Sequence, residues 1–113
     1  MKQTQTRTIQ DAHVLDIIGR FDSSSAEEVA SQLNSLSSIP NVRVIVNMAA
    51  TSFVDSTGLA TLVHALRRCQ QVGGELVLCN VQRPILMIFE LTRLDQAFSI
   101  FVDERHALQS LAI

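Results

Sequence analysis

The sequence predicts one α/β domain with a mixed, mainly parallel sheet, an N-terminal antiparallel hairpin and about four helices. First, short apolar runs alternate with segments in which apolar residues recur every three or four positions. Second, 113 residues suffice for one core but not for two ordinary domains. Third, the chain is 47% hydrophobic and 18% charged, which is typical of a chain that folds unaided. We therefore assign residues 1–113 to a single domain.

The first third of the chain predicts an antiparallel hairpin followed by a helix. Residues 4–9 and 13–18 are β-prone and are separated by a short turn-like link, so these two strands should pair. Residues 22–25 (DSSS) then precede an apolar stripe with helical spacing. At its start, Ser24 and Glu27 fit a capping box, in which two side chains satisfy free backbone N–H groups. The stripe consists of Ala26, Val29, Ala30, Leu33 and Leu36.

The middle of the chain predicts two buried strands with a long helix between them. Residues 42–46 (VRVIV) and 75–79 (ELVLC) are nearly continuous apolar runs, as expected inside a parallel sheet. The helix should end at Gly73-Gly74, because glycine tolerates the positive φ angle that often follows a helix. Its apolar stripe consists of Leu59, Leu62, Val63, Leu66 and Cys69.

The last third predicts a third helix, a short strand and a terminal helix. Pro84 suits the first turn of a helix over residues 85–91, and residues 98–102 (FSIFV) have the composition of a strand. Asp103 is suited to cap the final helix. Repeated strand-helix-strand units require right-handed crossovers, and binding sites in such sheets lie beyond the carboxyl ends of the strands.

The segment Asp55-Ser56-Thr57-Gly58 stands where a strand passes into the long helix. A hydroxyl or carboxylate there can serve as a helix cap, worth roughly 0.5–2 kcal/mol. One cap needs one residue, however, whereas three are present, and Gly58 costs around 1 kcal/mol in a helix relative to Ala. A glycine also lets another backbone approach, for example that of a partner protein. Ser56 is therefore a candidate for an exposed, modifiable hydroxyl.

A phosphate on Ser56 would add roughly −1.5 to −2 charges beside Asp55. It would also lie near Asp22 if the two strand ends are neighbours. The helix dipole and free N–H groups would offset this repulsion within the domain. A partner docked on the same end would instead bury an unpaired charge, so we expect its affinity to fall about a hundredfold or more.

Four pieces of sequence, in this order and spacing, resemble a STAS domain of the anti-sigma-factor antagonist family. They are residues 19–22 (GRFD), Asn47, residues 55–59 (DSTGL) and residues 73–79 (GGELVLC). The resemblance extends over essentially the whole chain. It implies a STAS-like fold and a switch protein that binds a partner kinase, without enzymatic activity or a cofactor of its own.

The resemblance implies a specific cycle. Unmodified, the protein would bind an anti-sigma factor with serine kinase activity and so release a sigma factor. Phosphorylation at Ser56 would switch it off, and a metal-dependent serine phosphatase would restore it. The acidic residue associated with kinase recognition maps onto Asp22. The predicted partner-binding residues are Phe21, Asp22, Ser23, Asp55, Thr57 and Gly58.

The sequence departs from the family pattern at three places. Arg20 stands where many relatives carry an acidic or small residue, and Ala49-Ala50 replaces a more polar stretch. Arg93 stands where glycine is common, so a turn with positive φ would carry about 1 kcal/mol of strain or more. We expect these changes to alter the partner rather than the fold.

The five phenylalanines are assigned by their surroundings in the sequence. Phe53, Phe89, Phe98 and Phe101 lie within apolar patterns and are predicted core residues. Phe21 follows a glycine in a predicted loop, so we expect a partly exposed contact residue.

Composition makes several other functions unfavourable. A net charge of −2 with scattered basic residues disfavours nucleic acid and anionic membranes as partners. The N-terminus has no apolar leader and the apolar runs are short, so we expect a cytoplasmic protein without membrane insertion. Cys69 and Cys79 are predicted to be small core residues, with a disulfide between them as the less favoured alternative. The three histidines have no metal-ligand spacing, so no metal is expected.

Two other functions remain open at the level of sequence. A STAS subunit of a lipid or anion transport assembly would use the hydroxyls of Ser56 and Thr57 only as caps. A phosphoswitch adaptor in another signalling system would keep the Ser56 switch but change the partner. Independently, the exposed edge of residues 4–9 could pair with a second copy and form a weak homodimer.

Overall fold

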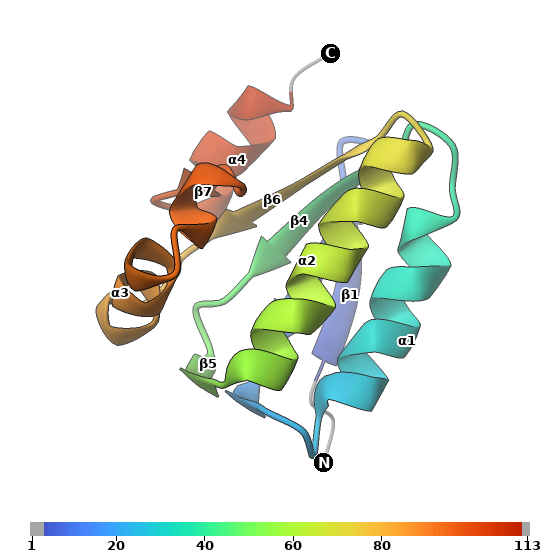
Figure 1. Ribbon diagram of the computed structural model, residues 1–113. Helices are drawn as coiled ribbons and strands as arrows, with labels where there is room; N and C mark the ends of the chain where they lie inside the picture. Colours follow the sequence, from blue (N-terminus) through green and yellow to red (C-terminus); the bar gives the residue numbers. More distant parts are fainter. Residues whose placement is uncertain (1–3, 112–113) are drawn as a thin grey trace.

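The computed structural model describes residues 4–111, which form a mixed sheet with helices on both faces (Figure 1). The sheet has the strand order β1-β2-β4-β6-β7. The first pair is antiparallel and the other three pairs are parallel, as predicted. The strands are β1 (Thr4–Ile9), β2 (Ala12–Ile17), β4 (Arg43–Asn47), β6 (Glu75–Cys79) and β7 (Ile100–Phe101).

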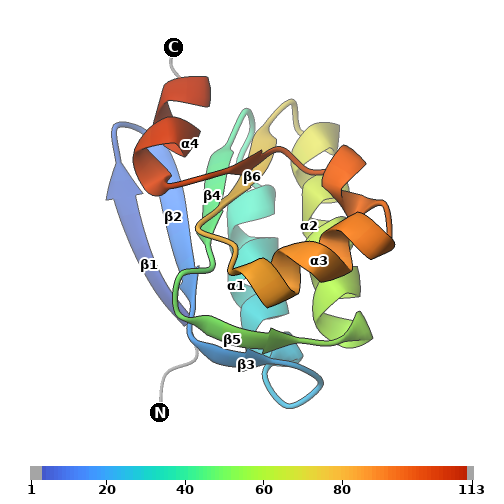
Figure 2. The same ribbon diagram turned by 90° about the vertical axis from the view of Figure 1, so that its left-hand side faces the viewer.

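Within residues 4–111, four α-helices complete the predicted α/β class. Figures 1 and 2 show α1 and α2 side by side on one face of the sheet and α4 on the other. A single turn of 3₁₀ helix, Leu94–Gln96, follows α3. The helices are α1 (Ala26–Ser37), α2 (Ser56–Gln71), α3 (Arg83–Leu91) and α4 (Glu104–Ser110).

Two apolar clusters pack on opposite faces of the sheet because side chains alternate along each strand. In β4, for example, Val44 and Val46 face α1 and α2, whereas Ile45 packs on the α4 side with Ala107 and Leu111. Cys69 and Cys79 are free and buried, as predicted. Burial raises the pKa of these two thiols to about 11 and about 12, respectively, so neither is a thiolate at neutral pH.

A second, two-stranded sheet was not anticipated from the sequence. It consists of β3 (Gly19–Phe21) and β5 (Thr51–Val54), paired in parallel with a register shift between Gly19 and Arg20. The Thr51 hydroxyl donates a hydrogen bond of 2.8 Å to the carbonyl of Ile17, which ties β5 to the end of β2. Figure 2 shows this pair lying across the lower end of the main sheet, beneath α1 and α2.

The predicted capping box at the start of α1 is wrong. The N-cap is Ser25, and its hydroxyl donates to the carbonyl of Arg20 at 2.7 Å instead of capping the helix. Ser24 lies one residue further from the helix and donates through its hydroxyl to Asp22 Oδ1 at 2.6 Å. Both hydroxyls therefore hold the loop between β3 and α1.

The predicted turn conformations are confirmed, whereas the last strand is shorter than predicted. Gly73 has a φ angle of 74° after α2, and Arg93 has a φ angle of 64° after α3. Strand β7 begins only at Ile100, because the backbone N–H groups of Ala97 and Phe98 still bond to the carbonyl of Leu94 and belong to the turn that follows α3. Phe98 is buried and packs edge-on against Phe89, with ring centroids 5.8 Å apart, so both are core residues as predicted.

An ion-pair network joins α4 to the edge of the sheet. Arg7 Nε lies 3.0 Å from Asp16 Oδ2, and Arg7 Nη2 lies 2.7 Å from Glu104 Oε1. Asn47 Nδ2 also donates to Glu104 Oε1 at 3.1 Å. The hydrogen bonds from Arg7, and secondarily from Asn47, hold the pKa of Glu104 below its ordinary value of 4.5.

We expect Glu104→Gln to lower the free energy of unfolding by roughly 1–2 kcal/mol near neutral pH. Because the pKa of Glu104 is depressed in the folded state, its contribution is present above pH 4.5 and is lost as pH falls through the folded pKa. Urea unfolding of both proteins at several pH values measures this. The difference should shrink towards about pH 3, and a difference independent of pH would contradict the assignment.

Candidate functional site

The paired ends of β3 and β5 bring the two predicted polar clusters together. Phe21 and Val54 are partners in the parallel pair, so Asp22 and Asp55 are the first residues after two neighbouring strand ends. The backbone N–H of Asp55 donates to the carbonyl of Phe21 at 3.3 Å. The condition under which a phosphate on Ser56 would lie near Asp22, that the two strand ends are neighbours, is therefore met, and Figure 2 shows the loop after β3 beside the start of α2.

The residue that caps α2 is Asp55, and this leaves the neighbouring serine free. Asp55 Oδ1 accepts a hydrogen bond of 3.0 Å from the N–H of Gly58. Ser56 is the first residue of α2 and is exposed, and within residues 4–111 its hydroxyl has no hydrogen-bond partner. Capping therefore explains Asp55 and does not explain Ser56.

We expect Asp55→Ala to destabilise the protein by about 0.5–2 kcal/mol, because the Gly58 N–H would lose its acceptor. Ser56→Ala is the matched control, since it removes an adjacent oxygen that has no partner among residues 4–111. This control should stay within roughly 0.5 kcal/mol of the wild type. Thermal and chemical unfolding would measure both, and a larger loss for Ser56→Ala would reverse the assignment of the cap.

Gly58 is buried against the protein's own chain, which corrects its expected role. A Cβ atom at this position would lie 2.6 Å from the carbonyl oxygen of Phe21, closer than real Cβ atoms come. The missing side chain at Gly58 therefore makes room for the backbone of β3 and not for the backbone of a partner protein. Phe21 was expected to be partly exposed, and this is wrong: the side chain is 0% exposed because it closes β3 beneath α2.

Asp22 is held in place by the loop that follows it. Its Oδ1 accepts from the N–H of Ser24 at 3.0 Å and from the Ser24 hydroxyl at 2.6 Å, while its Oδ2 lies 3.2 Å from Arg20 Nε. The Ser24 bonds first, and Arg20 second, hold the pKa of Asp22 below its ordinary value. Asp22 is therefore an anion at neutral pH and is a poor base for activating a hydroxyl.

Phe53 and Arg20 form a contact that was not predicted. Phe53 was expected in the core and is instead 37% exposed, with the Arg20 guanidinium carbon 4.0 Å from its ring centroid. The two residues are partners in the β3–β5 pair. The only sequence signal was the departure of Arg20 from the family pattern, and it could not identify Phe53 while β3 and β5 were unrecognised.

One end of the molecule therefore gathers most of the predicted site. Ser23, Ser56 and Thr57 are exposed there, and Asp22 and Asp55 are partly buried. These side chains present hydroxyls and carboxylates at the start of a long helix. Among them, the Ser56 hydroxyl is exposed and has no hydrogen-bond partner within residues 4–111.

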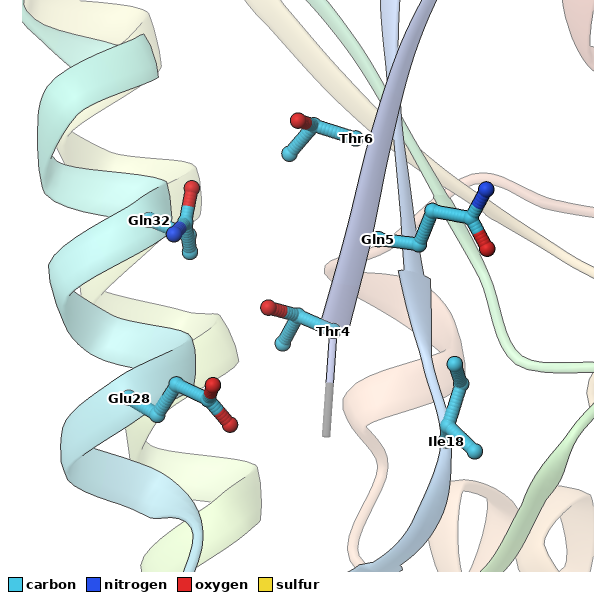
Figure 3. Close-up of a pocket in the computed structure, with 6 residues that line it drawn as sticks. All are labelled: Thr4, Gln5, Thr6, Ile18, Glu28 and Gln32. Atoms are coloured by element: carbon cyan, nitrogen blue, oxygen red, sulfur yellow. The ribbon is translucent and has the colours of Figure 1, made fainter. Parts of the chain in front are cut away.

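Residues 4–111 contain no group of three or more side chains suited to hold a metal ion. In the same range, no helix is long and apolar enough to cross a membrane. A hollow of about 440 Å³ lies between β1 and α1 and contains none of the predicted site residues. Figure 3 shows Thr4 and Thr6 of β1 pointing towards Glu28 and Gln32 of α1 across this hollow.

The fold and the site define a small α/β domain that presents an exposed serine hydroxyl at one end of the molecule, where two acidic residues follow neighbouring strands. The chain belongs to the STAS domain family, whose model matches residues 3–107. The resemblance found in the sequence is thereby confirmed.

Three relatives illustrate the family. The anti-sigma F factor antagonist of Paenibacillus polymyxa is 22% identical over 101 residues, covering 88% of this chain and 86% of that protein. A STAS domain protein from Planctomyces limnophilus, described as an anti-sigma-factor antagonist, superposes with a TM-score of 0.88 at 18% identity, covering 97% and 98% of the two chains. The Bacillus cell fate determinant SpoIIAA in its phosphorylated form superposes with a TM-score of 0.75 at 20% identity, covering 96% and 99%.

Proposed function

We propose that residues 1–113 act as one STAS domain and as an anti-sigma-factor antagonist controlled by phosphorylation of Ser56. Unmodified, the protein binds an anti-sigma factor that has serine kinase activity, and the bound anti-sigma factor releases its sigma factor. Phosphorylation of Ser56 by that kinase ends the interaction, and a metal-dependent serine phosphatase restores it. The protein itself acts by binding its partner and catalyses no reaction.

The observation that carries the proposal is the free, exposed hydroxyl of Ser56 at the start of α2. Asp55 already caps the helix, so a modification of Ser56 would break no hydrogen bond to residues 4–111. The relatives support the same class, since several are named anti-sigma factor antagonists. A solved relative with this fold is described as phosphorylated.

The local charges support a switch in binding rather than in fold. A phosphate on Ser56 would be placed beside the carboxylate of Asp55 and near that of Asp22, while α2 would direct its positive end towards it. The domain can therefore carry the group with little rearrangement. A partner surface packed over this end would have to bury the added charges, which it cannot neutralise without cations of its own.

The proposed partners regulate transcription, and we therefore place the protein in the cytoplasm. Capture from a lysate of the native cells, with wild-type and Ser56→Asp proteins as parallel baits, tests the function. The wild type should retain a protein with a serine kinase domain and anti-sigma activity, and the Ser56→Asp bait should lose it. Arg105→Ala, a substitution on the exposed side of α4, serves as the bait control and should behave as the wild type.

Other results would assign other functions. A transport ATPase or membrane protein retained equally by both baits would contradict the phosphoswitch and favour a subunit of a transport assembly. The wild-type bait could also retain a kinase that the Ser56→Asp bait loses but that controls no sigma factor. That result would support the phosphoswitch and assign it to another signalling system.

A further inference from the structure

We propose that Arg20, braced by Phe53, is a specificity residue that takes a carboxylate of the partner kinase at the Ser56 end of the molecule. This inference rests on the proposed function and adds the chemistry of the partner's surface. It starts from three observations: a guanidinium held in position, terminal nitrogens without partners among residues 4–111, and an exposed aromatic ring beneath it.

The Arg20 side chain is fixed on two sides although it is largely exposed. Its guanidinium carbon lies 4.0 Å from the centroid of the Phe53 ring, a geometry that favours a cation over an aromatic face. Its Nε lies 3.2 Å from Asp22 Oδ2, and the side chain is 63% exposed. An unrestrained surface arginine loses rotamer freedom when it binds a partner, and this loss lowers the affinity. Arg20 is already held in one conformation, so its entropic cost on binding is smaller.

The same contacts leave the outer edge of the guanidinium available. The bond to Asp22 uses Nε, and within residues 4–111 the two terminal nitrogens of Arg20 donate to no acceptor. Asp22 cannot turn to bind them without giving up its bonds to Ser24 through Oδ1. A guanidinium edge of this kind fits a carboxylate with two parallel hydrogen bonds.

The position of this pair relates it to Ser56. Arg20 and Phe53 are partners across β3 and β5, and β5 leads through Val54 and Asp55 into Ser56. Figure 2 shows β3 and β5 together at the end of the molecule where α2 begins. A kinase that reaches Ser56 therefore meets the exposed Phe53 ring and the Arg20 cation in the same approach. Aromatic and arginine side chains are the residues that most often dominate binding energy in protein interfaces.

The donors of Arg20 identify the group that would bind here as a carboxylate, because its two terminal nitrogens are positively charged and have no acceptor within residues 4–111. Asp22 and Asp55 bear negative charges at this end and would repel a partner's carboxylate unless it is directed to Arg20. The surface around Arg20 and Phe53 therefore selects partners by where their acidic side chains lie. An acidic side chain over Phe53 is favoured, and one over the loop after β3 is repelled. A partner with a basic residue opposite Arg20 would be excluded.

The test uses the purified cognate kinase, the same protein that is used to phosphorylate Ser56, and measures its affinity for a set of variants. Arg20→Ala should weaken binding about tenfold or more. Phe53→Leu should weaken it only severalfold, because leucine removes the aromatic face under the guanidinium but keeps the apolar bulk. Arg105→Ala, an exposed arginine on α4, is the matched control for loss of one positive charge and should bind as the wild type. Affinity of the wild type should also fall more steeply with salt than that of Arg20→Ala.

A set of kinase variants with single Asp→Asn or Glu→Gln changes then locates the carboxylate. One of them should weaken binding to the wild type and cause little further loss with Arg20→Ala, as expected for a direct pair. If Arg20→Ala binds as the wild type while Ser56→Asp still releases the kinase, the inference about Arg20 fails and the proposed function stands. If the wild type neither binds the kinase nor is phosphorylated by it, both fail.

Discussion

Replacing Ser56 by Asp is expected to weaken binding of the anti-sigma kinase about a hundredfold, whereas replacing it by Ala should leave binding nearly unchanged. The reason is the placement of the hydroxyl. It is exposed and is outside the cap of α2, so its loss removes no hydrogen bond to residues 4–111, but a carboxylate there would face the partner beside Asp55. Burial of that unpaired charge in an interface accounts for the loss.

Titration calorimetry or surface-immobilised binding would measure these affinities, with thermal unfolding run in parallel. Thr57→Asp is the matched control, because it adds the same charge at the neighbouring exposed position of the same helical turn. We expect Thr57→Asp to weaken binding less than Ser56→Asp. Equal losses would mean that this end responds only to net charge, and no loss with Ser56→Asp would exclude Ser56 from the interface.

The second large effect concerns the pair Phe21 and Phe53, which the structure separates into core and surface. Phe21→Ala should lower the free energy of unfolding by about 3–5 kcal/mol, because a fully buried ring beneath α2 would leave a cavity. Phe53→Ala should cost less than about 1 kcal/mol, since Phe53 is 37% exposed and one face of its ring lies against the Arg20 guanidinium.

Urea unfolding at one pH would measure both substitutions. Their order in binding should be the opposite of their order in stability: Phe53→Ala should lower the affinity for the kinase more than Phe21→Ala does. Binding must be measured at a temperature where Phe21→Ala remains folded. A stable Phe21→Ala together with a strongly destabilised Phe53→Ala would contradict the burial described for β3 and β5. Phe89→Ala, in the core away from these strands, supplies the reference value for a buried phenylalanine.

The long elements were predictable because their periodicity extends over several turns or residues. Helix α2 and the strands β4 and β6 lie where apolar spacing placed them, and the positive φ angles of Gly73 and Arg93 were indicated by turn chemistry and by the family pattern. The same reasoning placed Asp22 and Asp55 at strand ends. Their contact followed only from the assumption that the two strands are neighbours.

The short strands were not predictable for a physical reason. Strands of three or four residues show too little alternation to identify a buried face, so β3 and β5 gave no reliable pattern. Consequently Phe21 and Phe53 were assigned to the wrong environments. The register shift between Gly19 and Arg20 then decides which side chain meets Phe53, and local sequence carries no signal for such a shift.

The most direct measurement of the central claim is the mapping of phosphate after incubation of the purified protein with its cognate anti-sigma kinase and ATP. Mass spectrometry of the peptides should place one phosphate on Ser56, and Ser56→Ala should remain unmodified under the same conditions. Phosphate on Thr57 alone, or none on a protein that binds the kinase, would contradict the claim that the free hydroxyl at the start of α2 is the switch.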